Sequence, residues 1–400
     1  MKDLRWLAET TAPRGFRAGA VRAGIKTEGL DFALIVSDGD CGAAVFTQSQ
    51  FCAPPVILSR GHAANGRLRV IAANSGCANA CTGASGLANA RETVEIVAHA
   101  LDVRPDEILV ASTGIIGQSL PMPLIREAIS PAVQSLSQNG FEDAALAILT
   151  TDTSPKQAAV AFDIDDIPVT ISGMVKGAGM VAPRMATVFG FFATDATIDP
   201  VHLKEIFGRV ISRTLNRATV DGDTSTNDTA CILASGASGA AAIEPGTSGS
   251  ARFEAALLEL GQELARKMAR GGEGATHLVT IRAVGARTEA DAEAIALTIA
   301  NSPLVKTALF GGDPNWGRIA MAAGRAGVSF DQERVDITLN GFEVMRSGQR
   351  VSFDEPALTD SLRREEIAIE VNLNQGAAEA VAWTCDLSYE YVEINAEYHT

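Results

Sequence analysis

The stretch KGAGMVAPRMATVFGFF, from Lys176 to Phe192, is the most informative part of this chain. It places one hydroxyl, that of Thr187, between a loop rich in glycine and proline and an apolar run that predicts a buried strand. A threonine at the head of a strand is the arrangement that an N-terminal nucleophile requires. If the Ala186–Thr187 bond were cut, the new α-amino group, with an ordinary pKa of about 7.7–8.0, would lie beside the hydroxyl and act as its base. A buried threonine in an ordinary strand is the alternative.

The composition bounds the fold and excludes some functions. The chain has 400 residues, 46% of them hydrophobic, and a formal net charge of −15, which predicts two or three structural units. This acidity argues against a nucleic-acid partner, whose phosphates need clustered Lys and Arg. No apolar run approaches the roughly 20 residues of a membrane span, and the N-terminus lacks the apolar core of a signal peptide. We therefore expect a cytoplasmic protein with no membrane partner.

The sequence predicts no metal site. The six cysteines form no CxxC pair and have no histidines at ligand spacing, so we expect reduced thiols. The acid-rich segment TVDGDTSTND (219–228) superficially suggests a calcium loop. It lacks the EF-hand spacing and the glutamate at the twelfth loop position.

Hydrophobic periodicity predicts an α/β fold of α+β layers. A β-hairpin should turn at Asp165–Asp166, between two apolar runs within 159–175. Further strands are predicted at 32–38, 42–47, 56–58, 68–76, 107–113 and 275–284, and a polar loop leads into a small-residue strand within 221–239. Helices are predicted at 86–101, 124–136, 142–149, 202–218, 252–272, 289–301 and 355–364. The tail, 388–400, alternates like an edge strand.

Several glycine-rich or polar segments suggest chemistry. In STGIIGQSLP (112–121), Gly114 would let backbone N–H groups approach a ligand and Thr113 adds a hydroxyl donor, as an oxyanion hole requires. In GGEGATH (271–277), Glu273 could bind a substrate amine. Ordinary glycine turns and helix caps are the alternatives for both. The segments TTDTSPK (150–156) and FGGDPNWGR (310–318) have typical turn composition.

Taken together, such segments make the sequence resemble the bifunctional ornithine acetyltransferase/glutamate N-acetyltransferase family of arginine biosynthesis. The resemblance runs in order from about Thr11 to Thr400 with few gaps. Nine blocks carry it: GFRAGAVRAGIK, NSGCANACTG, STGIIGQSLPM, TTDTSPK, KGAGMVAPRMAT, TVDGDTSTND, GGEGAT, SPLVKTALFGGDPNWGRI and YVEINAEYHT. Nine blocks in one order argue against chance similarity.

The resemblance implies an ornithine acetyltransferase-type fold with an N-terminal-nucleophile-like active site. It implies self-cleavage between Ala186 and Thr187 into an α chain, 1–186, and a β chain, 187–400, which stay associated in an α2β2 heterotetramer. Thr187 would serve as nucleophile both in this cleavage and in acetyl transfer from N2-acetylornithine to L-glutamate. Transfer in two covalent steps predicts ping-pong kinetics.

The resemblance also assigns roles to individual positions. Thr113 and Gly114 match the oxyanion-hole pair. Lys176 suits the α-carboxylate shared by both amino acids, and Glu273 could hold a substrate ammonium or tune the Thr187 amine. The family's substrate-binding positions match Thr150, Lys176, Thr187, Glu273, Asn395 and Thr400. No cofactor is implied, and use of acetyl-CoA as a co-substrate stays open.

The chain departs from the family pattern at four positions: Cys77 for the more usual Asn, Arg184 for Asn or His, His277 for Lys and His399 for Arg. Arg184 and His277 could alter side-chain specificity, so an acyltransferase with altered amino-acid specificity is one alternative. A related self-processing amidase or aminopeptidase, in which water takes the acyl group, is another. A non-catalytic amino-acid-binding protein, whose Thr187 never becomes a chain end, is the third.

Overall fold

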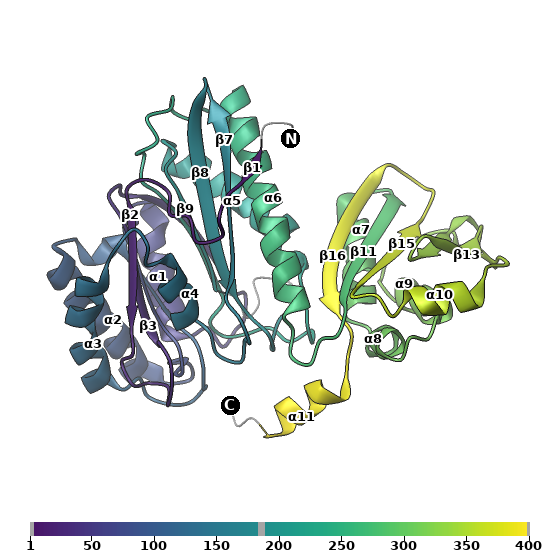
Figure 1. The fold of residues 1–400 in the computed structure, drawn as a ribbon, viewed down its shortest axis with the longest axis horizontal. Coiled ribbons are helices and arrows are strands. Elements are labelled where there is room, and N and C mark those ends of the chain that lie inside the picture. Colours follow the sequence, from purple (N-terminus) through teal and green to yellow (C-terminus); the bar gives the residue numbers. More distant parts are fainter. Residues whose placement is uncertain (1–3, 183–188, 398–400) are drawn as a thin grey trace.

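The computed structural model describes residues 4–182 and 189–397, and Figure 1 shows them as three sheets with their covering helices. The central sheet has the strand order β1-β7-β8-β9-β10-β4. All neighbours in it are antiparallel except β9 and β10. Its strands are β1 (Arg5–Trp6), β4 (Cys41–Phe46), β7 (Lys156–Ile164), β8 (Ile167–Lys176), β9 (Phe189–Thr194) and β10 (Thr229–Ala234).

The predicted hairpin is confirmed as β7 and β8. Asp165 and Asp166 form its two-residue turn, and their φ angles of 49° and 62° are those of a type I′ turn. Aspartate tolerates this left-handed conformation better than most residues. The hairpin brings Lys176, the last residue of β8, next to the first residue of β9, Phe189.

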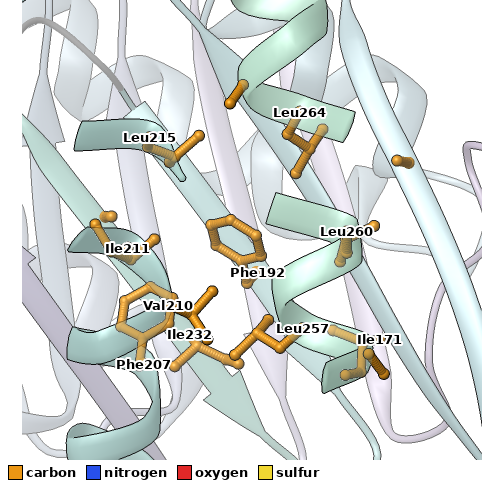
Figure 2. Close-up of a cluster of buried hydrophobic side chains, with 14 of the residues drawn as sticks. Ile171, Phe192, Phe207, Val210, Ile211, Leu215, Ile232, Leu257, Leu260 and Leu264 are labelled. Atoms are coloured by element: carbon orange, nitrogen blue, oxygen red, sulfur yellow. The ribbon is translucent and has the colours of Figure 1, made fainter. Parts of the chain in front are cut away.

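A second sheet stacks on the central one. It has the order β2-β3-β5-β6, and its strands are β2 (Phe16–Val21), β3 (Phe32–Ser37), β5 (Val70–Asn74) and β6 (Ile108–Ser112). Alternate residues of β9 show the stacking, since side chains alternate between the faces of a strand. Phe189 and Phe191 pack in the core between the two sheets. Phe192 points to the opposite face, where Figure 2 shows it among Val210, Leu257 and Leu260.

Helices cover both outer faces. On the central sheet these are α5 (Pro200–Arg213) and α6 (Ser248–Arg270), and on the second sheet α2 (Gly83–Leu101) and α3 (Met122–Ser135). The result is a four-layer helix–sheet–sheet–helix arrangement. Shorter elements complete it: α1 (Pro54–His62), α4 (Phe141–Ala147) and the 3-10 helices η1 (Ala63–Asn65), η2 (Pro105–Glu107) and η3 (Leu215–Arg217).

The third sheet forms a separate body with its own core. Its order is β14-β13-β12-β15-β11-β16. The strands are β11 (Leu278–Ala286), β12 (Asp336–Leu339), β13 (Phe342–Arg346), β14 (Gln349–Arg350), β15 (Glu366–Asn372) and β16 (Ala378–Cys385). The helices are α7 (Glu289–Ala300), α8 (Pro303–Phe310), α9 (Trp316–Gly324) and α10 (Glu355–Ser361), with the 3-10 helix η4 (Gln332–Arg334).

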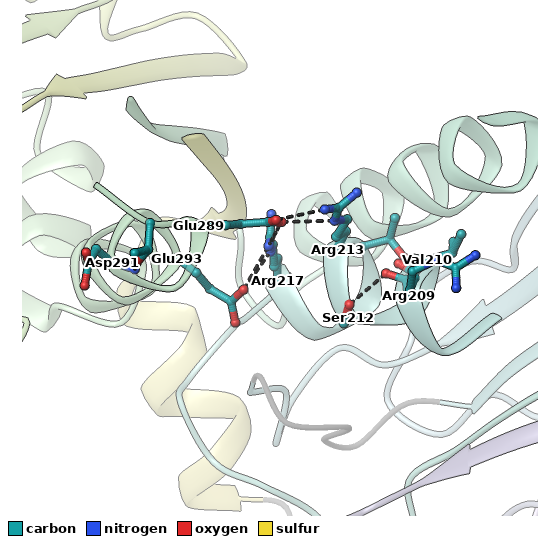
Figure 3. Close-up of polar contacts among 10 residues, drawn as sticks. Arg209, Val210, Ser212, Arg213, Arg217, Glu289, Asp291 and Glu293 are labelled. Atoms are coloured by element: carbon teal, nitrogen blue, oxygen red, sulfur yellow. Dashed lines mark hydrogen bonds and ion pairs between the residues drawn. The ribbon is translucent and has the colours of Figure 1, made fainter. Parts of the chain in front are cut away.

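An ion-pair network joins this body to the layered one. Figure 3 shows the Glu289 carboxylate between the guanidinium groups of Arg213 and Arg217. Arg217 also donates to Glu293 at 2.8 Å, and its side chain is only 7% exposed. The network therefore ties α7 to the end of α5 and to η3.

Two sequence predictions of strands are wrong. Residues 56–58 lie in α1, which begins at Pro54 because proline fits the first helical turn. Only one face of α1 is buried, including Val56 and Ser59, while Ile57 is 49% exposed. The tail forms α11 (Tyr389–Glu397) instead of an edge strand. Ser388 accepts a hydrogen bond from the Tyr391 N–H, as an N-cap does. None of the residues of α11 is buried. The helix therefore needs no apolar residues at three- and four-residue spacing, and its sequence lacks the pattern by which a helix is predicted.

No helix in 4–182 or 189–397 combines the length and the apolar character that crossing a membrane takes.

Candidate functional site

A pocket of about 140 Å³, the size for a small molecule, lies where β6, β8, α6 and α11 end or meet. The structure brings together six of the residues predicted from the sequence: Thr113, Gly114, Thr150, Lys176, Glu273 and Asn395. Two further predicted residues, Thr187 and Thr400, lie outside the described residues, as do Ala186, Arg184 and His399.

Lys176 and Thr113 meet at one wall of the pocket. The Lys176 Nζ atom donates to Thr113 Oγ1 at 3.1 Å, and both side chains are buried. Because the ammonium donates to this oxygen, the hydroxyl proton of Thr113 is directed elsewhere. Burial lowers the pKa of Lys176, and the Asp152 carboxylate opposes that shift.

Gly114 occupies a position that no larger residue could fill. Its φ is +128°, and an added Cβ would lie 2.4 Å from the carbonyl carbon of Gly76. The loop after β6 therefore packs directly on the loop after β5. The Thr113 N–H donates to the Asn74 carbonyl at 3.0 Å. No acceptor in the described part of the chain engages the Gly114 N–H, which leaves this group available to a ligand.

Asp152 organises the cationic side of the pocket. Its carboxylate accepts from Lys156 Nζ at 2.5 Å and from the Gly177 N–H at 2.8 Å. Burial acts to raise the pKa of Asp152, but the ammonium groups of Lys156 and Lys176 outweigh it, so this pKa lies below its usual range. The buried acid thus joins the turn after Thr150 to the end of β8.

Glu273 supplies the opposite charge. Its backbone N–H donates to the Ala178 carbonyl at 2.8 Å, and its Oε2 accepts from Asn395 Nδ2 at 2.7 Å. The carboxylate lies over Gly179, where an added Cβ would be 2.3 Å from Oε2. The glycine therefore makes room for an acid that is 92% buried, its exposed fraction being 8%.

The loop 219–228 supports the wall of the pocket. Asp221 accepts from the backbone N–H groups of Met180 and Val181 at 2.5 and 2.9 Å. It therefore fixes the segment that follows β8. Among the described residues, no group of three or more His, Cys, Asp or Glu is arranged to hold a metal ion.

Sequence reasoning missed eight residues that line the pocket: Ala78, Ile116, Thr151, Gly179, Met180, Ser225, Thr226 and Asn227. The last three belong to the polar loop 219–228, for which the sequence suggested no substrate-binding residue. Their signal was a cluster of hydroxyl and amide groups just before a buried strand.

Two of the positions that depart from the family pattern can be located. Cys77 is 2% exposed, and its thiol points to the Gln118 carbonyl. His277 hydrogen-bonds the Arg364 carbonyl through Nδ1 at 2.8 Å. Neither residue is among the described residues that line the pocket.

A sequence profile of the ArgJ family matches residues 17–400. The chain belongs to the ArgJ family. A relative from Symbiobacterium thermophilum, the arginine biosynthesis bifunctional protein ArgJ, is 46% identical over 402 residues, which cover 99% of this chain and 100% of the relative. This confirms the resemblance inferred from the nine blocks.

Solved ArgJ-family structures are also similar. The crystal structure of the arginine biosynthesis bifunctional protein ArgJ from Bacillus halodurans matches with a TM-score of 0.51 at 40% identity, covering 52% of this chain and 98% of its own. The ornithine acetyltransferase of Mycobacterium tuberculosis, solved with ornithine, gives a TM-score of 0.42 at 41% identity and covers 45% of this chain and 98% of its own. The Bacillus structure thus confirms the predicted mixed α/β fold of the ArgJ family.

Proposed function

We propose that this chain transfers the acetyl group of N2-acetylornithine to L-glutamate in arginine biosynthesis, with Thr187 as nucleophile. Membership of the ArgJ family supports the reaction. The observation that carries it is the charge arrangement of one small pocket. It holds a buried cation, Lys176, a buried carboxylate, Glu273, and the two donor groups of Thr113 and Gly114.

The first step is self-cleavage. The Thr187 hydroxyl attacks the Ala186 carbonyl, the peptide C–N bond breaks, and the acyl group moves to oxygen as an ester. Water then hydrolyses the ester, giving a carboxylate at Ala186 and a free α-amine at Thr187. The Bacillus structure supports this proposal, since 98% of its chain aligns with only 52% of this chain, about the share that one of the two proposed fragments would make up.

Acetyl transfer then takes two displacements. The Thr187 oxygen attacks the acetyl carbonyl of acetylornithine, and its proton passes through the α-amine to the departing nitrogen of ornithine. The amine of glutamate next attacks the acetyl-Thr187 ester and restores the hydroxyl. In both steps the carbonyl oxygen gains negative charge, which the Thr113 hydroxyl and the Gly114 N–H would stabilise by about 2.7–4 kcal/mol per donor.

The charged walls orient the substrates. Lys176 would bind the α-carboxylate common to acetylornithine and glutamate, with Thr150 beside it. Glu273, held by Asn395, would bind an ammonium group or the Thr187 amine. Thr400 is assigned to substrate binding by resemblance alone.

Three finer expectations belong to the same proposal. The α chain, 1–186, and the β chain, 187–400, assemble as an α2β2 heterotetramer. The enzyme acts in the cytoplasm. Acetyl-CoA is the candidate for a second acetyl donor. A donor panel with glutamate as acceptor, comparing acetylornithine with acetyl-CoA, decides the last point.

The decisive experiment compares the wild-type chain with Thr187→Ala and Thr187→Ser. The wild type should give two fragments on denaturing electrophoresis and form N-acetylglutamate from acetylornithine and glutamate. Thr187→Ala should stay a single chain without transfer, whereas Thr187→Ser should retain slower cleavage. One uncut wild-type band, or release of acetate in place of N-acetylglutamate, would overturn the proposal, the second result in favour of an amidase.

A further inference from the structure

We infer that Asn227 is a positioning residue that holds the Thr113–Gly114 loop in the geometry needed for acetyl transfer. This inference rests on the proposed function, in which these two residues stabilise the oxyanion.

Asn227 bridges two loops through a single amide group. Its Nδ2 donates to the carbonyl of Ala78 at 2.6 Å and to the carbonyl of Ser112 at 2.7 Å. Ala78 belongs to the loop after β5, and Ser112 is the last residue of β6. Asn227 is 5% exposed and lies in the pocket wall, so all three groups depend on one another for hydrogen bonds.

The amide is itself held in one orientation. Its Oδ1 accepts from the Thr226 hydroxyl at 2.5 Å, which turns the NH2 group toward the two carbonyls. The Asn227 backbone N–H donates to Ser225 Oγ at 3.1 Å, and its carbonyl accepts from Thr229 Oγ1 at 3.1 Å. Thr229 is the first residue of β10, so this hydrogen bond anchors Asn227 to a strand of the central sheet.

The peptide group between Ser112 and Thr113 is the one that this contact controls. Its carbonyl accepts from Asn227, and its N–H donates to the Asn74 carbonyl at 3.0 Å. A peptide plane held at both ends cannot rotate, because its six atoms move together. The held plane therefore sets where the Thr113 Cα atom lies, and the Thr113 side chain and the peptide group of the Gly114 N–H both start from this atom.

Backbone hydrogen bonds also join the two loops. The Ala78 N–H donates to the Ile115 carbonyl at 3.0 Å, the Ile115 N–H donates to the Gly76 carbonyl at 3.4 Å, and the Gly117 N–H donates to the Ala80 carbonyl at 2.9 Å. Asn227 closes this short ladder from the side of the pocket. Its loss would leave the Ala78 and Ser112 carbonyls without their donor, which favours rotation of both peptides toward water.

The test compares Asn227→Asp and Asn227→Ala with the wild type in the acetylornithine–glutamate assay. In Asn227→Asp an acceptor faces two carbonyls, so we expect kcat per cleaved chain to fall about 10- to 100-fold. KM for acetylornithine should stay within about 3-fold, because an oxyanion donor acts only in the transition state. Asn227→Ala, which removes the donor without adding repulsion, should show a smaller loss of kcat.

Asn340→Asp is the matched control. The side-chain amide of Asn340 also donates to a carbonyl, that of Ser361 at 3.1 Å, but Asn340 is only partly buried and lies in the turn between β12 and β13 of the third sheet. Its substitution should change the melting temperature and leave kcat unchanged.

The outcomes separate the two proposals. A wild-type chain without transfer activity contradicts the proposed function itself. With an active wild type, folded Asn227 variants of wild-type kcat overturn this inference, and so does a loss in which KM rises as much as kcat falls. If Asn227→Asp does not fold, the split between kcat and KM in Asn227→Ala decides by the same criteria.

Discussion

Replacing Gly179 by alanine should move the Glu273 carboxylate without disturbing the fold. An added Cβ would lie 2.3 Å from Oε2 and 2.5 Å from Cδ of Glu273, whereas ordinary contacts begin at 3.4 Å. The φ angle of Gly179 lies outside the left-handed range, so alanine fits the backbone. The clash must therefore be relieved by the glutamate, which has to retreat by about 1 Å.

The size of the effect follows from this displacement. A misplacement of about 1 Å in a positioned group can cost about 100-fold in rate. Because Glu273 contacts Asn395 and little solvent, it can relax only in part. We expect kcat/KM for acetylornithine to fall about 10- to 100-fold, or about 1.4–2.7 kcal/mol of transition-state stabilisation. Alanine restricts the unfolded chain, which is worth about 0.4–1 kcal/mol, but the displaced carboxylate strains the native state by about 1–3 kcal/mol. The free energy of unfolding should therefore stay level or fall by less than about 3 kcal/mol.

Steady-state kinetics and urea unfolding measure both quantities on the same preparation. Gly208→Ala is the matched control, because Gly208 lies in α5 with nothing within 4 Å of an added Cβ. It should increase stability by about 1 kcal/mol and leave the kinetics unchanged. A Gly179→Ala enzyme with wild-type kcat/KM would refute the role of Glu273 in substrate binding.

Other perturbations test the remaining groups. Because burial lowers the pKa of Lys176, KM for acetylornithine should rise with pH below the ordinary lysine pKa of about 10.4; in Lys176→Arg, whose guanidinium stays charged, a pH series of initial rates should show no such rise. Arg217→Met should lower the free energy of unfolding by about 1–3 kcal/mol, since its side chain is 7% exposed and bonded to two glutamates of α7. Arg209 is exposed, so Arg209→Met should lower the free energy of unfolding by only about 0.2–1 kcal/mol. Equal losses for the two variants in urea unfolding would contradict this difference. Asn395→Ala removes the 2.7 Å bond to Glu273 and should lower kcat/KM about 2- to 12-fold, the net value of one hydrogen bond, with an unchanged melting temperature.

The elements that sequence predicts best are those whose local signals agree. The 32–38 run is almost entirely apolar and forms β3, all six residues of which are buried. The Asp165–Asp166 turn agrees with the alternation on either side. In contrast, β2 (FRAGAV) was missed because glycine and alanine give it little hydrophobic signal, although they let α3 and α4 pack closely on it. The order of the strands was also beyond prediction, because β10 (Thr229–Ala234) pairs with β4 (Cys41–Phe46), which lies far away in the sequence.

The site could be predicted only in part, for a related reason. Its walls come from segments between Ala78 and Asn395, and nothing local indicates that they meet. Family resemblance supplied the two charged residues, Lys176 and Glu273, and two of the hydroxyl-bearing ones, Thr113 and Thr150. It did not assign a role to Asn227 or Gly179. Asn227 donates hydrogen bonds to backbone carbonyls, and Gly179 matters because its missing side chain leaves room for the Glu273 carboxylate. Neither property is visible in residue type without coordinates.

The architecture explains why self-cleavage at Ala186–Thr187 need not separate the two halves. The strand before this bond, β8, pairs with the strand after it, β9, over six residues from Ile171–Thr194 to Lys176–Phe189. Across the same sheet, β10 pairs with β4 over six more. Beyond β8, the Val181 carbonyl accepts from the Val220 N–H at 2.8 Å and the Thr219 hydroxyl at 2.9 Å. Since each core of the layered body that contains β9 also contains strands from the first half, separation would require unfolding the central sheet. Cleavage would therefore create a new chain start inside an assembly whose hydrogen bonds and core are already complete.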